Sequence, residues 1–232
     1  MEEIELLRQE LSSIQFLKGN MELPKDRISG TSFFPCGSGT FNNSTNKKSI
    51  LVLGQDQDNE TGFKTSLKNK SESHTATLRN MSELFKEANV NLEDCFFTNC
   101  VMGIRINAKR NVGKSPGLMD QEFLRQNLKY LKRQIQIIKP DSIIILGLIP
   151  LKFLSLISNE LRLKTIFLES FKEIDSKKCG FMREINFEEI GKVNVAVLVH
   201  PSHRKRNCQA REYNGSKGNM AEVEILKRIK SP

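Results

Sequence analysis

The sequence predicts a three-layer α/β/α fold with a central, mostly parallel sheet of four strands. Short apolar runs, each followed at once by glycine or polar residues, alternate along the chain with longer segments whose apolar residues recur at helical spacing. Strands that alternate with helices form parallel sheets, because right-handed crossover helices cover both faces. Two of the apolar runs lead directly into residue types that carry catalysis, a carboxylate and an imidazole.

The expected strands are short and apolar enough to be buried. They cover residues 49–53, 95–99, 142–146 and 193–199, and residues 164–168 are a further candidate. The clearest helix is residues 120–138, where Leu124, Leu128, Leu131, Ile135 and Ile138 recur at steps of three and four residues before Pro140. Other expected helices cover residues 3–18, 77–88, 150–159 and 220–229, whereas residues 169–192 are charged and irregular.

The chain divides into a short N-terminal part and one main domain. Residues 1–48 are an N-terminal helix and a polar loop that is packed on, or tethered to, the main domain at residues 49–232. The loop at residues 27–48 contains the apolar segment Phe33-Phe34-Pro35, which indicates that part of the loop is packed. It is therefore either an ordered rim of a pocket or a flexible lead-in.

Composition restricts the class of protein. No apolar run approaches the ~20 residues that a membrane helix needs, so we expect no membrane association. Five cysteines without a C-x-x-C pair argue against a disulfide framework and a metal site, and favour a cytoplasmic location. The net charge of +9 suits a nucleic-acid or nucleotide partner, although ordinary solubilising charge is the alternative.

Three polar residues follow or end predicted strands, where parallel sheets bind ligands. Asp56 follows Gly54 after the first strand, and it either caps a turn or acts on a ligand as a carboxylate. His200 follows the last strand and precedes Pro201, so its neutral imidazole N–H could stabilise an anion, unless it is a hydrogen-bonded core residue. Asn99 offers an amide that can read the edge of a base, or it caps a turn.

Two basic loops leave the same edge of the predicted sheet. They are candidate phosphate-binding segments, with solvated charge as the alternative. The first contains Arg105, Lys109, Arg110 and Lys114, and the second contains Arg204, Lys205, Arg206 and Arg211.

Three segments together resemble the uracil-DNA glycosylase superfamily. Gly54-Gln55-Asp56 is similar to the start of its G-Q-D-P-Y-H motif, residues 98–105 (T-N-C-V-M-G-I-R) to its L-N-x-x-L-T-V-R motif, and residues 200–204 (H-P-S-H-R) to its H-P-S-P loop. The motifs occur in the family order, and the resemblance runs from about residue 49 to residue 230. It implies the fold of that superfamily and an activity on bases in DNA.

The resemblance also implies roles for individual residues. Asp56 corresponds to the carboxylate that orients a water and stabilises the sugar cation, and His200 to the imidazole that supports the leaving uracil anion. Asn99, with Gln55, would bind the base, and Phe63 would stack on it. Arg204 would insert into the duplex, and the other expected DNA contacts are Ser202, Arg206, Arg105, Lys109 and Arg110.

The chain departs from the family pattern after Asp56. Residues 57–59 (Q-D-N) replace Pro-Tyr-His, which leaves the discrimination between uracil and thymine open. The cysteines do not match the iron–sulfur pattern of one branch of the family. We therefore expect a monomeric DNA glycosylase that removes uracil or a related damaged base without a metal or cofactor. The alternatives are a non-catalytic nucleic-acid-binding relative and an enzyme that processes free nucleotides or nucleosides.

Overall fold

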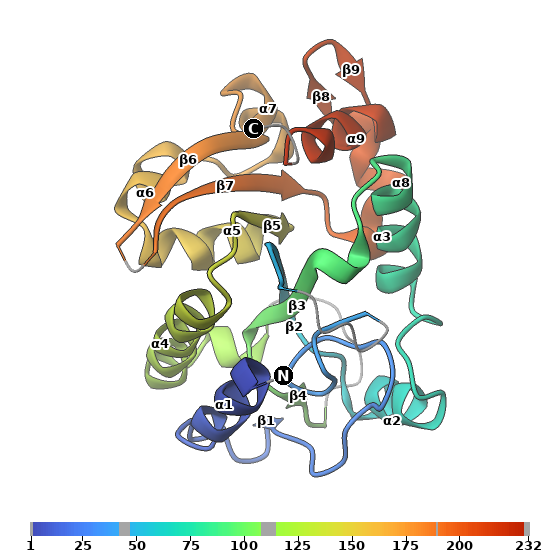
Figure 1. The fold of residues 1–232 in the computed structure, drawn as a ribbon, viewed down its shortest axis with the longest axis vertical. Coiled ribbons are helices and arrows are strands. Elements are labelled where there is room, and N and C mark those ends of the chain that lie inside the picture. Colours follow the sequence, from blue (N-terminus) through green and yellow to red (C-terminus); the bar gives the residue numbers. More distant parts are fainter. Residues whose placement is uncertain (1, 42–46, 108–114, 189, 230–232) are drawn as a thin grey trace.

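The computed structural model describes residues 2–41, 47–107, 115–188 and 190–229. A five-stranded sheet with the order β3-β2-β5-β7-β6 forms the middle layer (Figure 1). Its four parallel strands are β2, β3, β5 and β7, and β6 runs antiparallel at one edge. The bounds are Ile50–Asp56 for β2, Cys95–Val101 for β3, Ser142–Leu146 for β5, Phe181–Phe187 for β6 and Gly191–Leu198 for β7.

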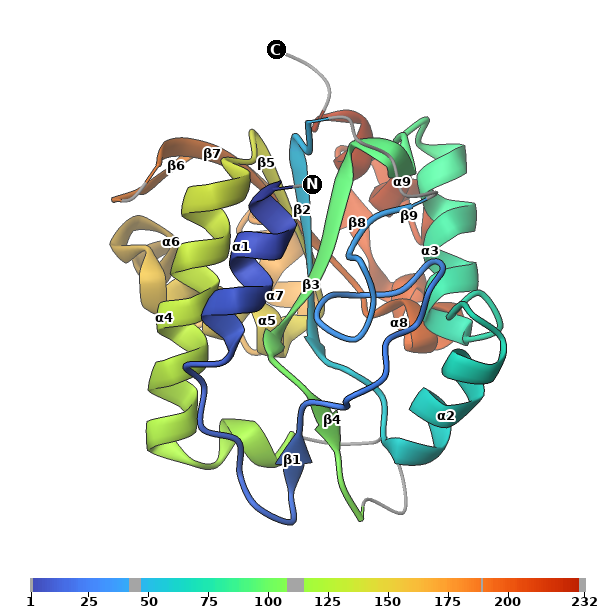
Figure 2. The ribbon, with the colours of Figure 1, turned by 60° about the horizontal axis from the view of Figure 1, so that its bottom comes forward.

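Helices cover both faces of the sheet, which confirms the three-layer prediction (Figure 2). On one face, Leu51 and Leu53 of β2 pack into a cluster with residues of α1 (Glu2–Leu11) and α4 (Gln121–Ile138). On the other face, Ile50 and Val52 pack into a second cluster with residues of α3 (Ala76–Glu87) and α9 (Asn219–Lys227). Because neighbouring residues of one strand point to opposite faces, both faces of the sheet are apolar and buried.

The helices are α1 Glu2–Leu11, α2 Glu60–Lys68, α3 Ala76–Glu87, α4 Gln121–Ile138, α5 Leu148–Leu154, α6 Asn159–Thr165, α7 Phe171–Ser176, α8 Arg204–Asn207 and α9 Asn219–Lys227. Each of the five predicted helical segments overlaps a helix, but α1 and α5 end before the predicted bounds at residues 18 and 159, and α2, α6, α7 and α8 were not predicted. Asp120 caps α4 through a hydrogen bond from Phe123 N to Asp120 Oδ1 (2.8 Å), and Lys139 ends it in a left-handed conformation before Pro140. Among the described residues, no helix combines the length and apolar content that a membrane crossing requires.

The sheet has one strand more than the four that the sequence predicts. Strand β6 lies within residues 169–192, which we expected to be irregular. Its register shifts between Met182 and Ile185, and both intervening residues, Arg183 and Glu184, are exposed. This bulge places two polar residues in a row, so the alternation that identifies a strand in the sequence is interrupted.

Residues 164–168 do not form the additional candidate strand. Helix α6 ends at Thr165, and Ser158 caps its start by accepting a hydrogen bond from Leu161 N (3.2 Å). Phe167 is 84 % exposed, so this apolar run is not part of the sheet. A short apolar run without flanking turn residues fits a helix end as well as a strand.

The N-terminal part packs closely against the main domain. Leu7 and Leu11 of α1 are buried in the cluster that contains α4, and Tyr130 Oη donates a hydrogen bond to Leu7 O (2.5 Å). Residues 33–39 run along the outer edge of β3, where Phe34 N donates to Phe97 O (2.9 Å) and Phe97 N donates to Gly39 O (2.7 Å). This segment of the polar loop is therefore ordered, and it satisfies backbone groups at an edge that would otherwise be open.

Two small strand pairs complete the fold. Strand β1, Met21–Glu22, pairs antiparallel with β4, Ile104–Arg105. Strand β8, Glu212–Tyr213, forms a hairpin with β9, Ser216–Lys217. The first pair joins the N-terminal part to the segment that follows β3, next to the functional site described below.

Candidate functional site

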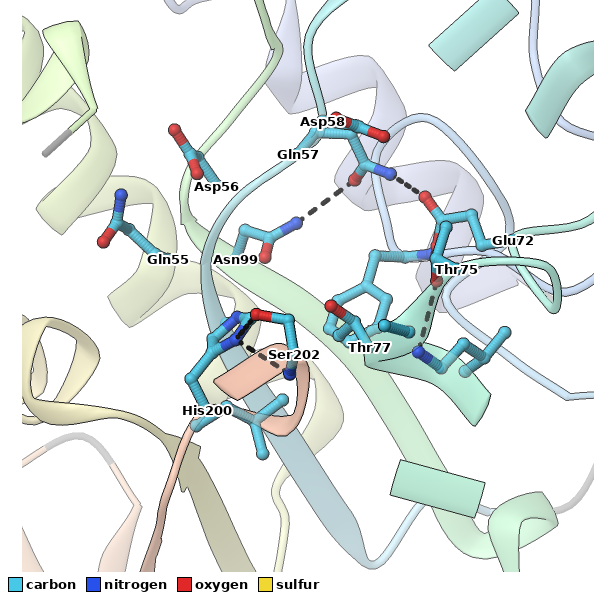
Figure 3. Close-up of a pocket in the computed structure, with 15 residues that line it drawn as sticks. Gln55, Asp56, Gln57, Asp58, Glu72, Thr75, Thr77, Asn99, His200 and Ser202 are labelled. Atoms are coloured by element: carbon cyan, nitrogen blue, oxygen red, sulfur yellow. Dashed lines mark hydrogen bonds between the residues drawn. The ribbon is translucent and has the colours of Figure 1, made fainter. Parts of the chain in front are cut away.

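A pocket of about 280 Å³ lies at the carboxyl ends of β2, β5 and β7 (Figure 3). Three predicted site residues, Asp56, Asn99 and His200, all line it, together with Gln55 and Ser202. Its volume is close to the lower end of the range of about 300–1,000 Å³ that is usual for ligand pockets. The fold therefore brings the ends of strands that are remote in the sequence to one cavity.

Asn99 lies directly opposite Gly54 in the parallel pairing of β2 and β3. Position 54 must be a glycine for the Asn99 side chain to fit, because a Cβ atom there would lie 2.4 Å from Asn99 Oδ1. Asn99 is only 3 % exposed, and its Nδ2 donates a hydrogen bond to Gln57 Oε1 (3.2 Å). The amide oxygen of Asn99 is thereby left on the pocket side (Figure 3).

A buried acid ends the hydrogen-bond chain that begins at Asn99. Gln57 Nε2 donates to Glu72 Oε1, and Phe33 N donates to Glu72 Oε2 (3.1 Å). Burial, with a smaller contribution from the nearby charge of Asp58, raises the pKa of Glu72 to about 7. Glu72 therefore changes its protonation state near neutral pH, unlike an ordinary glutamate.

His200 is held in one tautomer by the turn that follows it. Ser202 N donates a hydrogen bond to His200 Nδ1 (3.3 Å), and Ser202 Oγ lies 2.8 Å from the same atom. Since a backbone N–H can only donate, Nδ1 is the acceptor and Nε2 carries the proton. Burial, with a smaller contribution from His203, lowers the pKa of His200 to about 4.

The low pKa of His200 gives a direct test of this arrangement. A histidine with an ordinary pKa of about 6.5 is half charged near that pH, whereas His200 should stay neutral until the pH falls to about 4. We expect its Cε1 proton to titrate with a midpoint near 4 in an NMR pH titration, with the resonance assigned by its loss in His200→Gln. A midpoint above about 6 would contradict a half-buried imidazole that stays neutral at that pH.

The loop that carries His200 is anchored from two helices. Asn80 of α3 donates a hydrogen bond from Nδ2 to Pro201 O (2.8 Å). Val199 N donates to Oε1 of Glu222 on α9 (2.6 Å), and Glu222 has no exposed surface. These contacts fix the backbone on both sides of His200, as a positioned donor requires.

Arg204 belongs to this anchor and does not extend toward solvent. It is 8 % exposed, and its Nε donates to Glu222 Oε2 (3.1 Å), while Arg211 donates from NH1 to Glu222 Oε1 (3.1 Å). The prediction that Arg204 inserts into a DNA duplex is therefore wrong. To reach a duplex, Arg204 would have to break this buried ion pair and its hydrogen bond to Asn219.

Arg105 likewise makes an internal ion pair. Its Nε lies 2.6 Å from Oδ2 of Asp56 and its NH2 lies 3.1 Å from Oδ1, and the two side chains are 5 % and 8 % exposed. The prediction that Arg105 contacts phosphate is wrong, because its guanidinium is buried and paired with the carboxylate of Asp56. The carboxylate of Asp56 is held rigidly, and it points away from the Asn99 amide (Figure 3).

Phe63 does not reach the pocket. It packs with Ile28, Cys36 and Ile104 in a separate apolar cluster, so it cannot stack on a ligand as the sequence suggested. Phe33 lines the pocket instead, supported by Phe97 with a ring-centroid distance of 5.5 Å.

The remaining predicted contacts are placed in different ways. Ser202 and Arg206 are exposed near His200, in agreement with an accessible surface beside the pocket. Lys109 and Arg110 lie outside the described residues. In the part of the chain that the structure describes, no group of three or more His, Cys, Asp or Glu residues is arranged to hold a metal ion.

Sequence reasoning missed much of the pocket wall. Phe33, Asp58, Glu72 and residues 75–78 at the start of α3 all line it. The Phe33-Phe34-Pro35 segment gave the available signal, an aromatic cluster inside a polar loop. Nothing in the sequence marked Glu72, which lies in a serine-rich turn and becomes buried only through long-range packing.

The fold and the pocket define a class of α/β protein with a small cavity at the carboxyl edge of a parallel sheet, lined by an amide and a neutral imidazole. The family model described as "Uracil DNA glycosylase superfamily" matches residues 42–228, so the chain belongs to that superfamily. Members of that superfamily are generally hydrolases that act on bases in DNA. No curated protein sequence matches the chain significantly.

Proposed function

We propose that this protein is a DNA glycosylase that hydrolyses the N-glycosidic bond of uracil, or of a related damaged base, after the base has left the duplex. The observation that carries the proposal is that Asn99 and His200, from remote strands, line one small pocket. A base stacked in a duplex is out of reach of such a pocket, so the nucleotide must be extruded at a cost of a few kcal/mol.

The proposed reaction has separate needs at the sugar and at the base. Water adds to C1′ of the deoxyribose while the C–N bond breaks, and the bonding electron pair leaves with the base as an anion. The proton that the water loses would pass to Asp56 and then to the base, so that an abasic sugar and a neutral base result. The Nε2–H of His200 would stabilise that anion without giving up its proton, which suits an imidazole that stays neutral. Asp56 would orient the water and oppose the positive charge that develops on the sugar.

A second carboxylate, Asp58, also lines the pocket. Its Oδ1 accepts a hydrogen bond from Asn59 N (2.8 Å), and burial raises its pKa. Asp58 stands at the position of the tyrosine in the family motif, whereas Asp56 stands at that of the catalytic acid. We therefore assign the reaction with water to Asp56 and use Asp58 as the comparison.

Affinity for DNA would come mainly from phosphate contacts near the pocket. Lys205 and Arg206 are exposed in the loop that follows His200. Together with the net charge of +9, these side chains support a DNA-binding surface whose affinity falls steeply with salt.

The proposal predicts that the pure protein converts a uracil-containing oligonucleotide into an alkali-labile strand. We expect Asp56→Asn to lower the rate by about 10²-fold or more, and the matched variant Asp58→Asn to change it much less. The measurement is strand scission on gels after alkali, with single- and double-stranded substrates and several damaged bases. Intact strands throughout, with folded protein, would rule out the glycosylase.

One observation favours a second candidate function, a non-catalytic DNA-binding relative. The motif carboxylate Asp56 is fully engaged by Arg105, which reduces the charge it presents to a sugar. DNA binding that is unaffected by Asp56→Asn, combined with the absence of any turnover, would establish this function instead.

A further inference from the structure

Glu72, Gln57 and Asn99 form a hydrogen-bond chain that runs from the buried interior to the pocket (Figure 3). The three side chains are 7 %, 5 % and 3 % exposed, so water has little access to the chain. An ionised carboxylate can only accept hydrogen bonds. The Gln57 atom beside Glu72 must then be its amide nitrogen, and its oxygen must face Asn99.

The same constraint passes to Asn99. The Gln57 oxygen accepts a hydrogen bond, so Asn99 must turn its amide nitrogen toward Gln57 and its oxygen toward the pocket. Each amide is fixed because a reversed amide would bring two acceptors or two donors together in a buried place, where an unmade hydrogen bond is costly.

We propose that Glu72 is a positioning residue that, through Gln57, sets the orientation of the Asn99 amide and so selects the hydrogen-bonding edge of the base that the pocket accepts. This inference rests on the proposed function of the pocket in binding a base. Glu72 touches neither the base nor the sugar, because Gln57 and Asn99 separate it from them.

The selected edge belongs to bases that carry a ring N–H. An inward-facing Asn99 oxygen accepts from N3–H of uracil, and the second hydrogen of Nδ2 suits the neighbouring carbonyl. Cytosine presents an unprotonated N3 and an amino group. Its N3 would therefore face the Asn99 oxygen, and two acceptors would meet without a hydrogen bond. Protonated Glu72 can donate a hydrogen bond, which allows both amides to reverse and match cytosine.

The orientation should therefore depend on pH. Among the described residues, the titratable groups that interact with the charge of Glu72 are Asp58 from the loop after β2 and the Cys36 thiol from the N-terminal loop. Burial raises the pKa of Glu72 to about 7, so its carboxylate form, and with it the preference for uracil, is present above that pH and lost below it. His200 stays neutral throughout this range, since its pKa is lowered to about 4.

The test measures binding, so that it does not depend on turnover. Oligonucleotides carry one 2′-fluoro-2′-deoxyuridine or one 2′-fluoro-2′-deoxycytidine, which resist cleavage, and fluorescence anisotropy gives the two dissociation constants. For the wild type we expect uracil to be preferred about tenfold or more near pH 8, and by less than about threefold near pH 6.

Two variants interrupt the hydrogen-bond chain, and a third variant serves as a control. Glu72→Gln keeps the shape but removes the charge, and Gln57→Leu removes the relay. Because Phe33 N still donates to residue 72, the Glu72→Gln amide keeps its oxygen there and turns its nitrogen toward Gln57. This reverses both amides, so Glu72→Gln should shift the preference to the cytosine oligonucleotide. Gln57→Leu should bind the two oligonucleotides about equally, and neither variant should show the pH dependence. Glu83→Gln makes the same charge change at an exposed site on α3 and should behave as the wild type. Circular dichroism checks that each variant is folded.

The outcomes separate this inference from the glycosylase proposal. A wild type without any preference for uracil, or a folded Glu72→Gln that keeps the preference and its pH profile, overturns the role of Glu72. A preference that depends on Glu72, in a protein that cleaves no substrate, supports the relay and rejects the glycosylase. If neither variant folds, the pH profile of the wild type decides alone.

Discussion

The variant His200→Ala should lower the rate of uracil release by about 10²–10³-fold, because removing one donor to a developing anion typically costs about 2.7–4 kcal/mol. Its Nε2–H is the group that the turn at Ser202 holds ready for the leaving base. Single-turnover kinetics with excess enzyme isolates this step from product release. Substrate affinity should change little, since the anion forms only in the transition state.

The neighbouring histidine supplies the control for this experiment. His203 is exposed in the same loop and is not among the residues that line the pocket. His203→Ala should therefore keep nearly the full rate. Equal losses in the two variants would show that the loop, and not the imidazole of His200, is what the reaction needs.

The variant Glu222→Leu should lower the free energy of unfolding by about 3–5 kcal/mol, the usual cost of breaking a buried ion pair from one side. It removes the carboxylate that Arg204, Arg211 and Val199 N all contact. Because small domains have only about 5–15 kcal/mol of stability, this change would leave a marginal fold. Chemical denaturation followed by circular dichroism measures it.

A second glutamate on the same helix is the matched comparison. Glu224 pairs with Lys227 at 2.7 Å, with side chains 35 % and 50 % exposed. Glu224→Leu should change stability by no more than about 0.5 kcal/mol, because exposed pairs contribute little. Similar losses for Glu222→Leu and Glu224→Leu would show that the buried network is not what holds the His200 loop.

The sequence predicted the layers and the strand ends well, because these depend on local pattern. Asp56, Asn99 and His200 were identified from apolar runs that end in polar residues, and parallel pairing brings them to one pocket. The resemblance to the superfamily also rested on short local motifs, and the family model matches the same region, residues 42–228.

The partners of charged residues could not be predicted in the same way. Arg105 and Arg204 were placed on a DNA surface because each lies in a basic loop, yet both are buried against acids far away in the sequence. Burial of an arginine depends on where a distant carboxylate packs, and no periodicity records that. The same reason explains why Glu72 was overlooked and why Phe63 was expected to stack on the base although Phe33 lines the pocket.

The polar loop beside β3 has a consequence for where the working unit begins. Residues 33–39 close the open margin of β3 and bring Phe33 to the pocket, yet they precede residue 42, where the family match starts. A shortened protein that keeps only residues 42–228 would lose one wall of its pocket. It would also expose the unpaired backbone groups of the edge strand β3, which can then pair with another chain. Residues 42–228 alone are therefore too short to form the complete pocket.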